Sequence, residues 1–211
     1  STDAEGTFQG VTAFNSNGVS LGTELGANAN GQTFVGWQWQ AGQGSSSTNT
    51  SGYITSTVSV NASAGFSIVT YTGNLNASPS GGNDTVGHGL GVAPKMIIFK
   101  RRDGASSWMV WHTSLSSVSH VLQLNQTDAQ INSATAAGWL GGTPSTPTST
   151  IFGTNYITGR NVSGQTHVAY CWAEIAGFSK FGSDTGNGST DGPFVYLGFR
   201  PKFIMIKRYD A

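Results

Sequence analysis

Charged side chains are scarce in this sequence. Asp, Glu, Lys and Arg make up 9% of the 211 residues, and the formal net charge is zero. A typical soluble domain has about 25% of these residues. A nucleic-acid-binding domain normally carries a basic face, and electrostatic steering of a charged substrate needs an excess of one sign. The composition therefore argues against both, and we expect no nucleic-acid partner.

Cysteine and long apolar runs are also nearly absent. The single cysteine, Cys171, excludes an intrachain disulfide, and its alternating surroundings predict a small buried residue rather than a catalytic thiol. No apolar run approaches the ~18 residues of a membrane-spanning helix. The sequence has no G-x-S-x-G or H-E-x-x-H motif, and Glu24 and Glu174 have no second acid nearby in sequence. We therefore expect no enzymatic activity, no cofactor and no membrane span.

Glycine, small polar residues and aromatic residues take the place of the charges. There are 30 Gly, with six Trp, six Tyr and eleven Phe. Disordered chains lack aromatic residues, so we expect a folded core. Short apolar segments separated by turn residues predict an all-β fold, an antiparallel β-sandwich of the jelly-roll or lectin-like kind.

The clearest strand signal is at residues 96–99, which are apolar on both faces and follow Pro94. This pattern predicts a central strand that is covered on both sides and starts after the proline. Residues 108–112 and 120–125 are expected to be antiparallel neighbours. Period-two alternation or β-branched residues predict further strands at 33–40, 53–60, 66–72, 151–156 and 166–175. Loops are predicted at 41–51 and 138–149, a short helix fits only 127–137, and the core is expected to hold Trp37, Trp39, Trp108, Trp111 and Trp172.

Three segments occur twice in the same order. In the last pair, Pro94-Lys95 aligns with Pro201-Lys202, and Lys100-Arg101 aligns with Lys207-Arg208. We predict an internal duplication within one β unit over 1–211, with copies at 33–103 and 166–210. The copies are out of phase with the chain ends, so three explanations stay open: a segment of a longer chain, ends that pair with each other, or pairing between chains. The matches are 33–39 (TFVGWQW) with 166–172 (THVAYCW), 65–67 with 177–179 (both GFS), and 87–103 with 197–210.

Two clusters of cations are candidates for contacts. Lys100, Arg101 and Arg102 follow one apolar segment, and Lys207 and Arg208 follow its match. The simpler interpretation is that charge protects the edge of a sheet from further pairing. The alternative is contact with an anionic glycan or a neighbouring subunit.

Two loops are the other candidate sites. Asp184, Asn187 and Asp191 could present oxygens to Ca²⁺, although their spacing is not that of an EF-hand and these residues are common in turns. Trp139 lies in a Gly- and Pro-rich loop, where an exposed ring could stack on a sugar. The glycine-rich run at 87–91 precedes a strand instead of a helix, so it predicts a turn and not a phosphate site.

Several long runs resemble a known repeat module. AGFSIVTYTGN, GHGLGVAPKMIIFKRRD, THVAYCWAEIAGFSKFG and DTGNGSTDGPFVYLGFRPKFIMIKR, within 53–211, are similar to repeats of tailed-bacteriophage virion proteins, especially those of marine and cyanobacterial phages. The resemblance implies a non-enzymatic structural protein on the surface of the virion: a tail-fibre, spike, head-fibre or decoration component. It also implies a β-rich homo-oligomer that contacts other virion subunits and host surface glycans. A glycan-binding lectin-like module is the alternative. A polysaccharide-degrading enzyme is the least favoured, because it needs two acids that meet only in space.

Overall fold

The computed structural model describes residues 2–6, 9–74, 84–132, 146–154 and 161–210. The chain divides into two compact units. Residues 5–39 form the small unit, and residues 1–4 with 40–211 form the large unit. The prediction that 1–211 is one unit is not tested by this division.

The small unit is a hairpin followed by one helical turn. Strands β1 (Val11–Asn15) and β2 (Gly18–Leu21) pair antiparallel, and α1 (Leu25–Asn28) follows. Glu24 caps the turn, since its Oε1 accepts a hydrogen bond from the Gly26 amide at 3.2 Å. The apolar side chains of this hairpin are largely exposed, and none of the residues described in the small unit is buried.

The strand predicted at 33–40 is wrong. None of these residues belongs to a strand, and Trp37 and Trp39, which were predicted to be core residues, are exposed. Alternation shows that a segment suits a sheet, but a strand also needs a neighbour with which to share hydrogen bonds. No strand of the small unit pairs with this segment.

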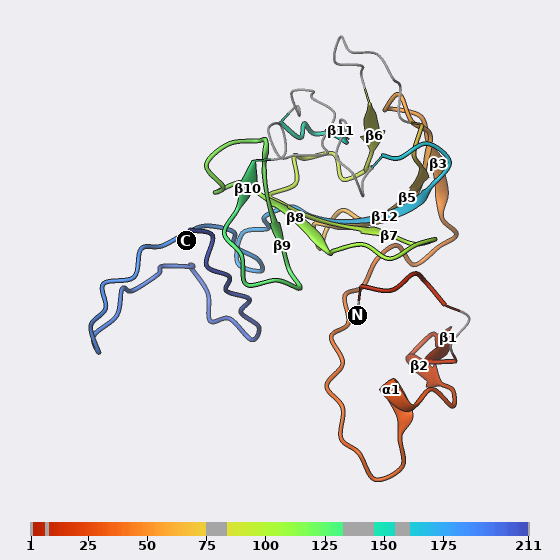
Figure 1. Ribbon diagram of the computed structural model, residues 1–211, viewed down its shortest axis with the longest axis horizontal. Helices are drawn as coiled ribbons and strands as arrows, with labels where there is room; N and C mark the ends of the chain where they lie inside the picture. Colours follow the sequence, from red (N-terminus) through yellow and green to blue (C-terminus); the bar gives the residue numbers. More distant parts are fainter. Residues whose placement is uncertain (1, 7–8, 75–83, 133–145, 155–160, 211) are drawn as a thin grey trace. The chain divides into compact units, whose positions relative to one another are not determined.

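The large unit is built on an eight-stranded sheet (Figure 1). Every adjacent pair in it is antiparallel, which confirms the predicted all-β antiparallel class. The jelly-roll subdivision and the lectin likeness are not confirmed. In spatial order the strands are β10 (Ile131–Asn132), β9 (His120–Gln123), β8 (Met109–His112), β7 (Met96–Arg101), β12 (Thr166–Trp172), β5 (Phe66–Thr72), β4 (Ser56–Asn61) and β3 (Ser47–Asn49).

Strand β12 lies in the middle of this sheet although it is the last strand, in chain order, of the described residues. Trp172 is opposite Phe66 of β5 on one side and opposite Met96 of β7 on the other. Strands β7, β8 and β9 form a meander, and β12 returns beside β7 after a long connection. This is the Greek-key relation.

A two-stranded sheet covers one face of the large sheet. Strands β6 (Thr85–Gly87) and β11 (Ile151–Gly153) pair antiparallel, and Figure 1 shows them over that face. Their buried Val86 and Phe152 join a core with Ile97 and Phe99 of β7, and the Phe99 and Phe152 ring centroids are 5.5 Å apart. The fold is thus a layered, sandwich-like β structure.

The opposite face carries a second core. Met96 and Ile98 of β7 contact Val110 and Leu122 there, and the later residues Phe181 and Tyr209 pack against them. Strand β7 is therefore apolar on both faces and covered on both, as its sequence predicts. Cys171 is fully buried in β12, and this prediction is also confirmed.

Several strand bounds differ from the predictions. The helix proposed for 127–137 is wrong where residues are described, because Ile131 pairs with Val121 in the edge strand β10. The loop predicted at 41–51 contains β3, which is held by its ladder to β4. The other predicted strands are also confirmed: β5 has the predicted bounds, β7 extends further, to Arg101, and the rest have shorter or shifted ends where residues are described.

The second copies of the repeated segments do not form strands. Pro94 introduces the central β7, whereas Pro201 introduces a run that belongs to no strand and in which Ile204, Met205 and Ile206 are exposed. Gly177 and Phe178 lie in a turn closed by the Ile175–Ser179 bridge. The duplication is not confirmed at the level of paired strands, because an apolar segment becomes a strand only when neighbours flank it.

Candidate functional site

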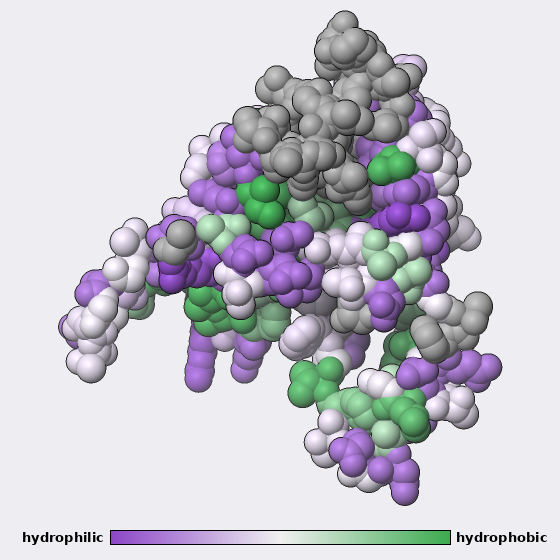
Figure 2. Space-filling model, viewed as in Figure 1, coloured by the Kyte–Doolittle hydropathy of each residue, from purple (hydrophilic) through white to green (hydrophobic). Residues whose placement is uncertain are grey.

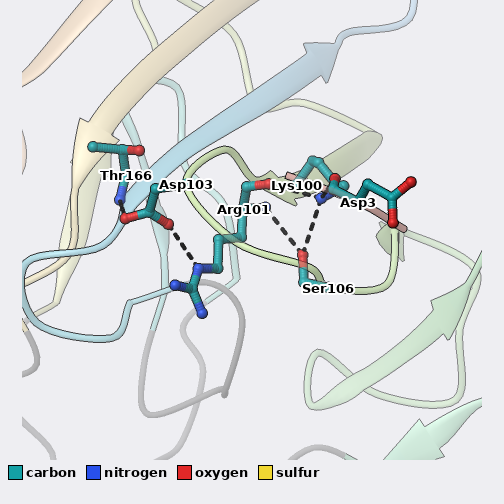
Figure 3. Close-up of polar contacts among 6 residues, drawn as sticks. All are labelled: Asp3, Lys100, Arg101, Asp103, Ser106 and Thr166. Carbon is teal, nitrogen blue, oxygen red and sulfur yellow. Dashed lines mark hydrogen bonds and ion pairs between the residues drawn. The ribbon is translucent and has the colours of Figure 1, made fainter. Parts of the chain in front are cut away.

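The first cation cluster lies at the C-terminal end of β7 (Figure 3). Only 6% of Lys100 is exposed. Its Nζ donates to the Asp3 carbonyl at 2.9 Å, to the Arg101 carbonyl at 2.8 Å and to Ser106 Oγ at 3.4 Å. Burial lowers the pKa of this ammonium, and the nearby Asp3 partly opposes the shift. Lys100 therefore links the start of the chain at Asp3 and the loop at Ser106 to the end of β7.

Arg101 and Asp103 close the turn after β7. Arg101 Nε donates to Asp103 Oδ1 at 2.7 Å, and Asp103 Oδ2 accepts from the Thr166 amide at 3.1 Å (Figure 3). The hydrogen bond from Arg101 is the largest cause that lowers the pKa of Asp103. The Arg102 amide also donates to the Thr166 carbonyl, at 2.9 Å. These contacts attach the end of β7 to the start of β12.

The edge-protection interpretation is wrong for this cluster. Strand β7 lies between β12 and β8 and is not an edge strand. The predicted glycan or subunit contact at Lys100, Arg101 and Arg102 stays a prediction, and the burial of Lys100 leaves the two arginines as its more accessible part.

The second cation cluster is more exposed. Lys207 Nζ donates to the Gln126 carbonyl at 2.8 Å, and Arg208 Nε lies 3.0 Å from Asp210 Oδ1. The side chain of Arg208 is 69% exposed, compared with 27% for Arg101 in the matching pair. A contact with a partner is thus more accessible at Arg208 than at Arg101.

The predicted calcium loop makes its own turn contacts. Asn187 Nδ2 donates to the Asp191 carbonyl at 2.9 Å, and Asn187 Oδ1 accepts from the Ser189 amide at 3.0 Å. Asp184 and Asp191 are exposed. The calcium site therefore stays a prediction, and Trp139 lies outside the described residues. Within the described ranges, no three His, Cys, Asp or Glu side chains are grouped to hold a metal ion.

The glycine-rich run leads from β6, which ends at Gly87, to the strand β7 without a helix between them, as its sequence predicts. Gly89 and Gly91 have φ values of 74° and 75°, a region that favours glycine. His88 is fully buried: its Nδ1 accepts from the Leu90 amide at 3.2 Å, and its Nε2 lies 3.1 Å from the Thr148 carbonyl. Burial lowers the pKa of His88, and a neutral ring with its proton on Nε2 satisfies both contacts.

Sequence reasoning missed one buried polar cluster next to β6 and β11. Asp84 and Asn161 are fully buried, and Asn161 Oδ1 accepts from the Asn74 amide at 3.0 Å. The Asp84 carbonyl accepts from both the amide and the hydroxyl of Thr154, at 2.8 and 2.9 Å. Burial raises the pKa of the Asp84 carboxyl, and the Asn161 side chain offsets this in part. Asp and Asn are ordinary turn residues, so no sequence signal marks these two.

A family model matches residues 1–211. The chain belongs to the DUF7483 family. This family is described as a domain of unknown function. No curated protein and no solved structure matches the chain significantly. The function of this DUF7483 domain therefore has to be argued from its own residues.

Several polar side chains of this DUF7483 domain link segments that are distant in sequence. Lys100, Asp103, His88 and Asn161 all bind backbone groups of segments distant in sequence. Long, apolar helices that could cross a membrane are not found in the part of the chain that the structure describes. Exposed large apolar side chains occur in residues 11–25, 33–39 and 194–206, among others.

Proposed function

We propose that this DUF7483 chain is a non-enzymatic structural component of a bacteriophage virion, displayed on the particle as part of a fibre, spike or decoration protein. Its partners are other virion subunits, including further copies of itself. The similarity of residues 53–211 to phage virion repeats supports this proposal. Buried polar side chains that link distant segments of the chain are also what a structural protein needs.

The exposed apolar segments are the observation that carries the proposal. Phe194, Ile204 and Ile206 are exposed on the C-terminal segment, and Phe34 and Val35 are exposed near the start of the chain. Exposed apolar side chains mark protein–protein contacts in folded proteins where they gather into a patch. A subunit that assembles with others uses such surface, whereas a chain that acts alone gains nothing from it.

Mass spectrometry and immunogold labelling of purified particles test this proposal. We expect peptides of this chain to co-purify with virions through a density gradient, and gold to mark an external appendage. Antibody pre-absorbed with the purified chain is the control. Absence of the chain from gradient-purified particles would contradict the proposal.

Glycan binding is the second candidate. Phe194 and Tyr196 are highly exposed and follow the 184–192 loop, and exposed aromatic rings stack on sugars. A glycan array with the full chain tests it, with Tyr196→Ala and Trp139→Ala as variants. Loss of signal in either variant supports sugar binding, and no signal at millimolar ligand removes this candidate.

A further inference from the structure

The three central strands of the large sheet show how the repeated segments can pair. Strand β12 pairs with β5 on one side and β7 on the other. Each of these strands has a second copy in the sequence: 33–39 matches β12, 177–181 begins like β5, and 203–208 matches β7. None of residues 33–39, 180–181 and 203–208 belongs to a strand. The chain therefore contains one paired set of these three strands and one set outside any sheet.

Backbone conformation supports the equivalence of the two sets. Three glycines that precede β12, β5 and β7 have positive φ, and so has the matching glycine before each second copy. Six of the eight positive-φ glycines of the described residues belong to these pairs. Such conformations are rare for other residues, so they mark equivalent turns. The pairs are Gly164 (76°) with Gly31 (72°), Gly65 (65°) with Gly177 (75°), and Gly91 (75°) with Gly198 (81°).

The end of the β7-like segment repeats a side-chain contact. Arg101 Nε lies 2.7 Å from Asp103 Oδ1, and Arg208 Nε lies 3.0 Å from Asp210 Oδ1. In the first copy this aspartate also accepts from the Thr166 amide at the start of β12. The second copy thus presents an acceptor in the position that binds a β12-like strand.

Exposure separates the two sets. Ile97 is 1% exposed and its match Ile204 is 63% exposed, while Val168 is 8% exposed and its match Val35 is 84% exposed. Figure 2 shows apolar surface, in green, where the C-terminal segment of Figure 1 runs. The segments with the composition of central strands are thus exposed on their own chain.

We propose that residues 33–39 of one copy of the chain insert between residues 177–181 and 203–208 of a second copy, and so complete a sheet built like β5–β12–β7. Adding a strand from another chain satisfies backbone groups and buries alternate side chains. The occupant is a copy of this chain because its sequence carries the one segment that matches the missing strand. This inference deepens the proposed function and rests on it for its biological role.

The proposed sheet has the strand order of the large sheet, with the β12-like segment between the β5-like and the β7-like segment. The only difference is that the β12-like segment, residues 33–39, comes from a second copy of the chain. Donor and acceptor are different surfaces, so association is head-to-tail and yields rings or rows. The observed register puts Gln38 opposite Ile204 and Trp39 opposite Phe203, as Cys171 is opposite Ile97 and Trp172 opposite Met96.

Disulfide trapping between two variants of the full chain tests this register. Gln38→Cys and Ile204→Cys are made separately, with different tags, and mixed under mild oxidation; the native Cys171 is fully buried. We expect a mixed disulfide dimer at least several-fold above either variant alone. Met205→Cys replaces Ile204→Cys in the matched control, because neighbouring residues of a strand face opposite sides. Equal yields from the two mixtures would overturn the proposal.

The double variant Gln38→Cys/Ile204→Cys distinguishes pairing of residues 33–39 with a second copy from pairing of the two segments within one chain. A disulfide formed only inside single chains at low concentration would overturn exchange with a second copy. Light scattering after size exclusion adds an independent readout. We expect the mass to rise with concentration in the wild type and less so in Ile204→Lys, with Val195→Lys as an exposed apolar control outside the matched segment. A mass that stays monomeric at every concentration would refute exchange without bearing on whether the chain is in virions.

Discussion

Replacing Ile97 with alanine should destabilise the large unit far more than the same replacement at Ile204. The two residues occupy matching positions of the repeated segment, but Ile97 is 1% exposed in the core beneath β6 and β11, and Ile204 is 63% exposed. Removing a buried isoleucine side chain to alanine costs about 2–5 kcal/mol, because transfer energy is lost and a cavity is left. An exposed replacement changes stability by about 0.5 kcal/mol or less.

Thermal unfolding of dilute protein measures the difference. For a unit of this size, each kcal/mol shifts the melting temperature by about 2–4 °C, so Ile97→Ala should lose about 4–20 °C and Ile204→Ala about 2 °C or less. Low concentration matters, because exchange of residues 33–39 between copies would bury Ile204. Repeating the measurement at high concentration should therefore increase the effect of Ile204→Ala.

Equal losses for the two variants in dilute protein would refute this reasoning. They would mean that residues 203–208 are packed within each chain as tightly as β7 is. The conservative pair Ile97→Val and Ile204→Val checks the ranking with a smaller change, for which a buried site costs about 0.5–1.5 kcal/mol.

Three further changes test other parts of the large unit. Lys100→Met keeps the side-chain volume but removes three hydrogen bonds donated by Nζ. It should lower the free energy of unfolding in urea by about 1–3 kcal/mol, because carbonyl groups lose their donor. An unchanged urea midpoint would show that these hydrogen bonds do not stabilise the fold. Gly65→Ala should lower the melting temperature more than Gly177→Ala, since both have positive φ but only at Gly65 would the new Cβ lie 2.7 Å from the Ala173 carbonyl oxygen; similar shifts would count against this packing. Asp84→Asn should raise the melting temperature at pH 7, because burial raises the pKa of Asp84 in the folded state above its usual value of 3.8. The wild type therefore loses stability as the pH rises from that usual value through the higher folded pKa, whereas the asparagine does not titrate. The gain should disappear below about pH 4, and a lower melting temperature at pH 7 would indicate a charged partner of the carboxylate.

Much of the sheet could be predicted from sequence because its inner strands carry their own signal. Residues 96–99 are apolar on both faces, and β7 is covered on both. Strand β5 has the predicted bounds Phe66–Thr72. Edge strands carry no such signal: β3 and β10 consist of short, mostly polar sequences that become strands only because a neighbour supplies a ladder.

The wrong predictions have one physical cause. Residues 33–40 alternate as well as β12 does, yet a strand requires partners that the local sequence does not encode. The same limit applies to the candidate site. Lys100 and Arg101 look alike as neighbouring cations, but only the tertiary positions of Asp3 and Ser106 show that one is buried and the other is not.

The central place of β12 constrains how the chain folds during synthesis. The strands β3 to β5 and β7 to β10 are meanders made of local contacts, and they can form as soon as they emerge. They cannot join until residues 166–172 arrive, about 100 residues after the start of β5. Until then β5 and β7 both present open edges, which invite pairing with any neighbouring nascent chain. A truncation that removes β12 should therefore leave two insoluble halves instead of a smaller folded domain.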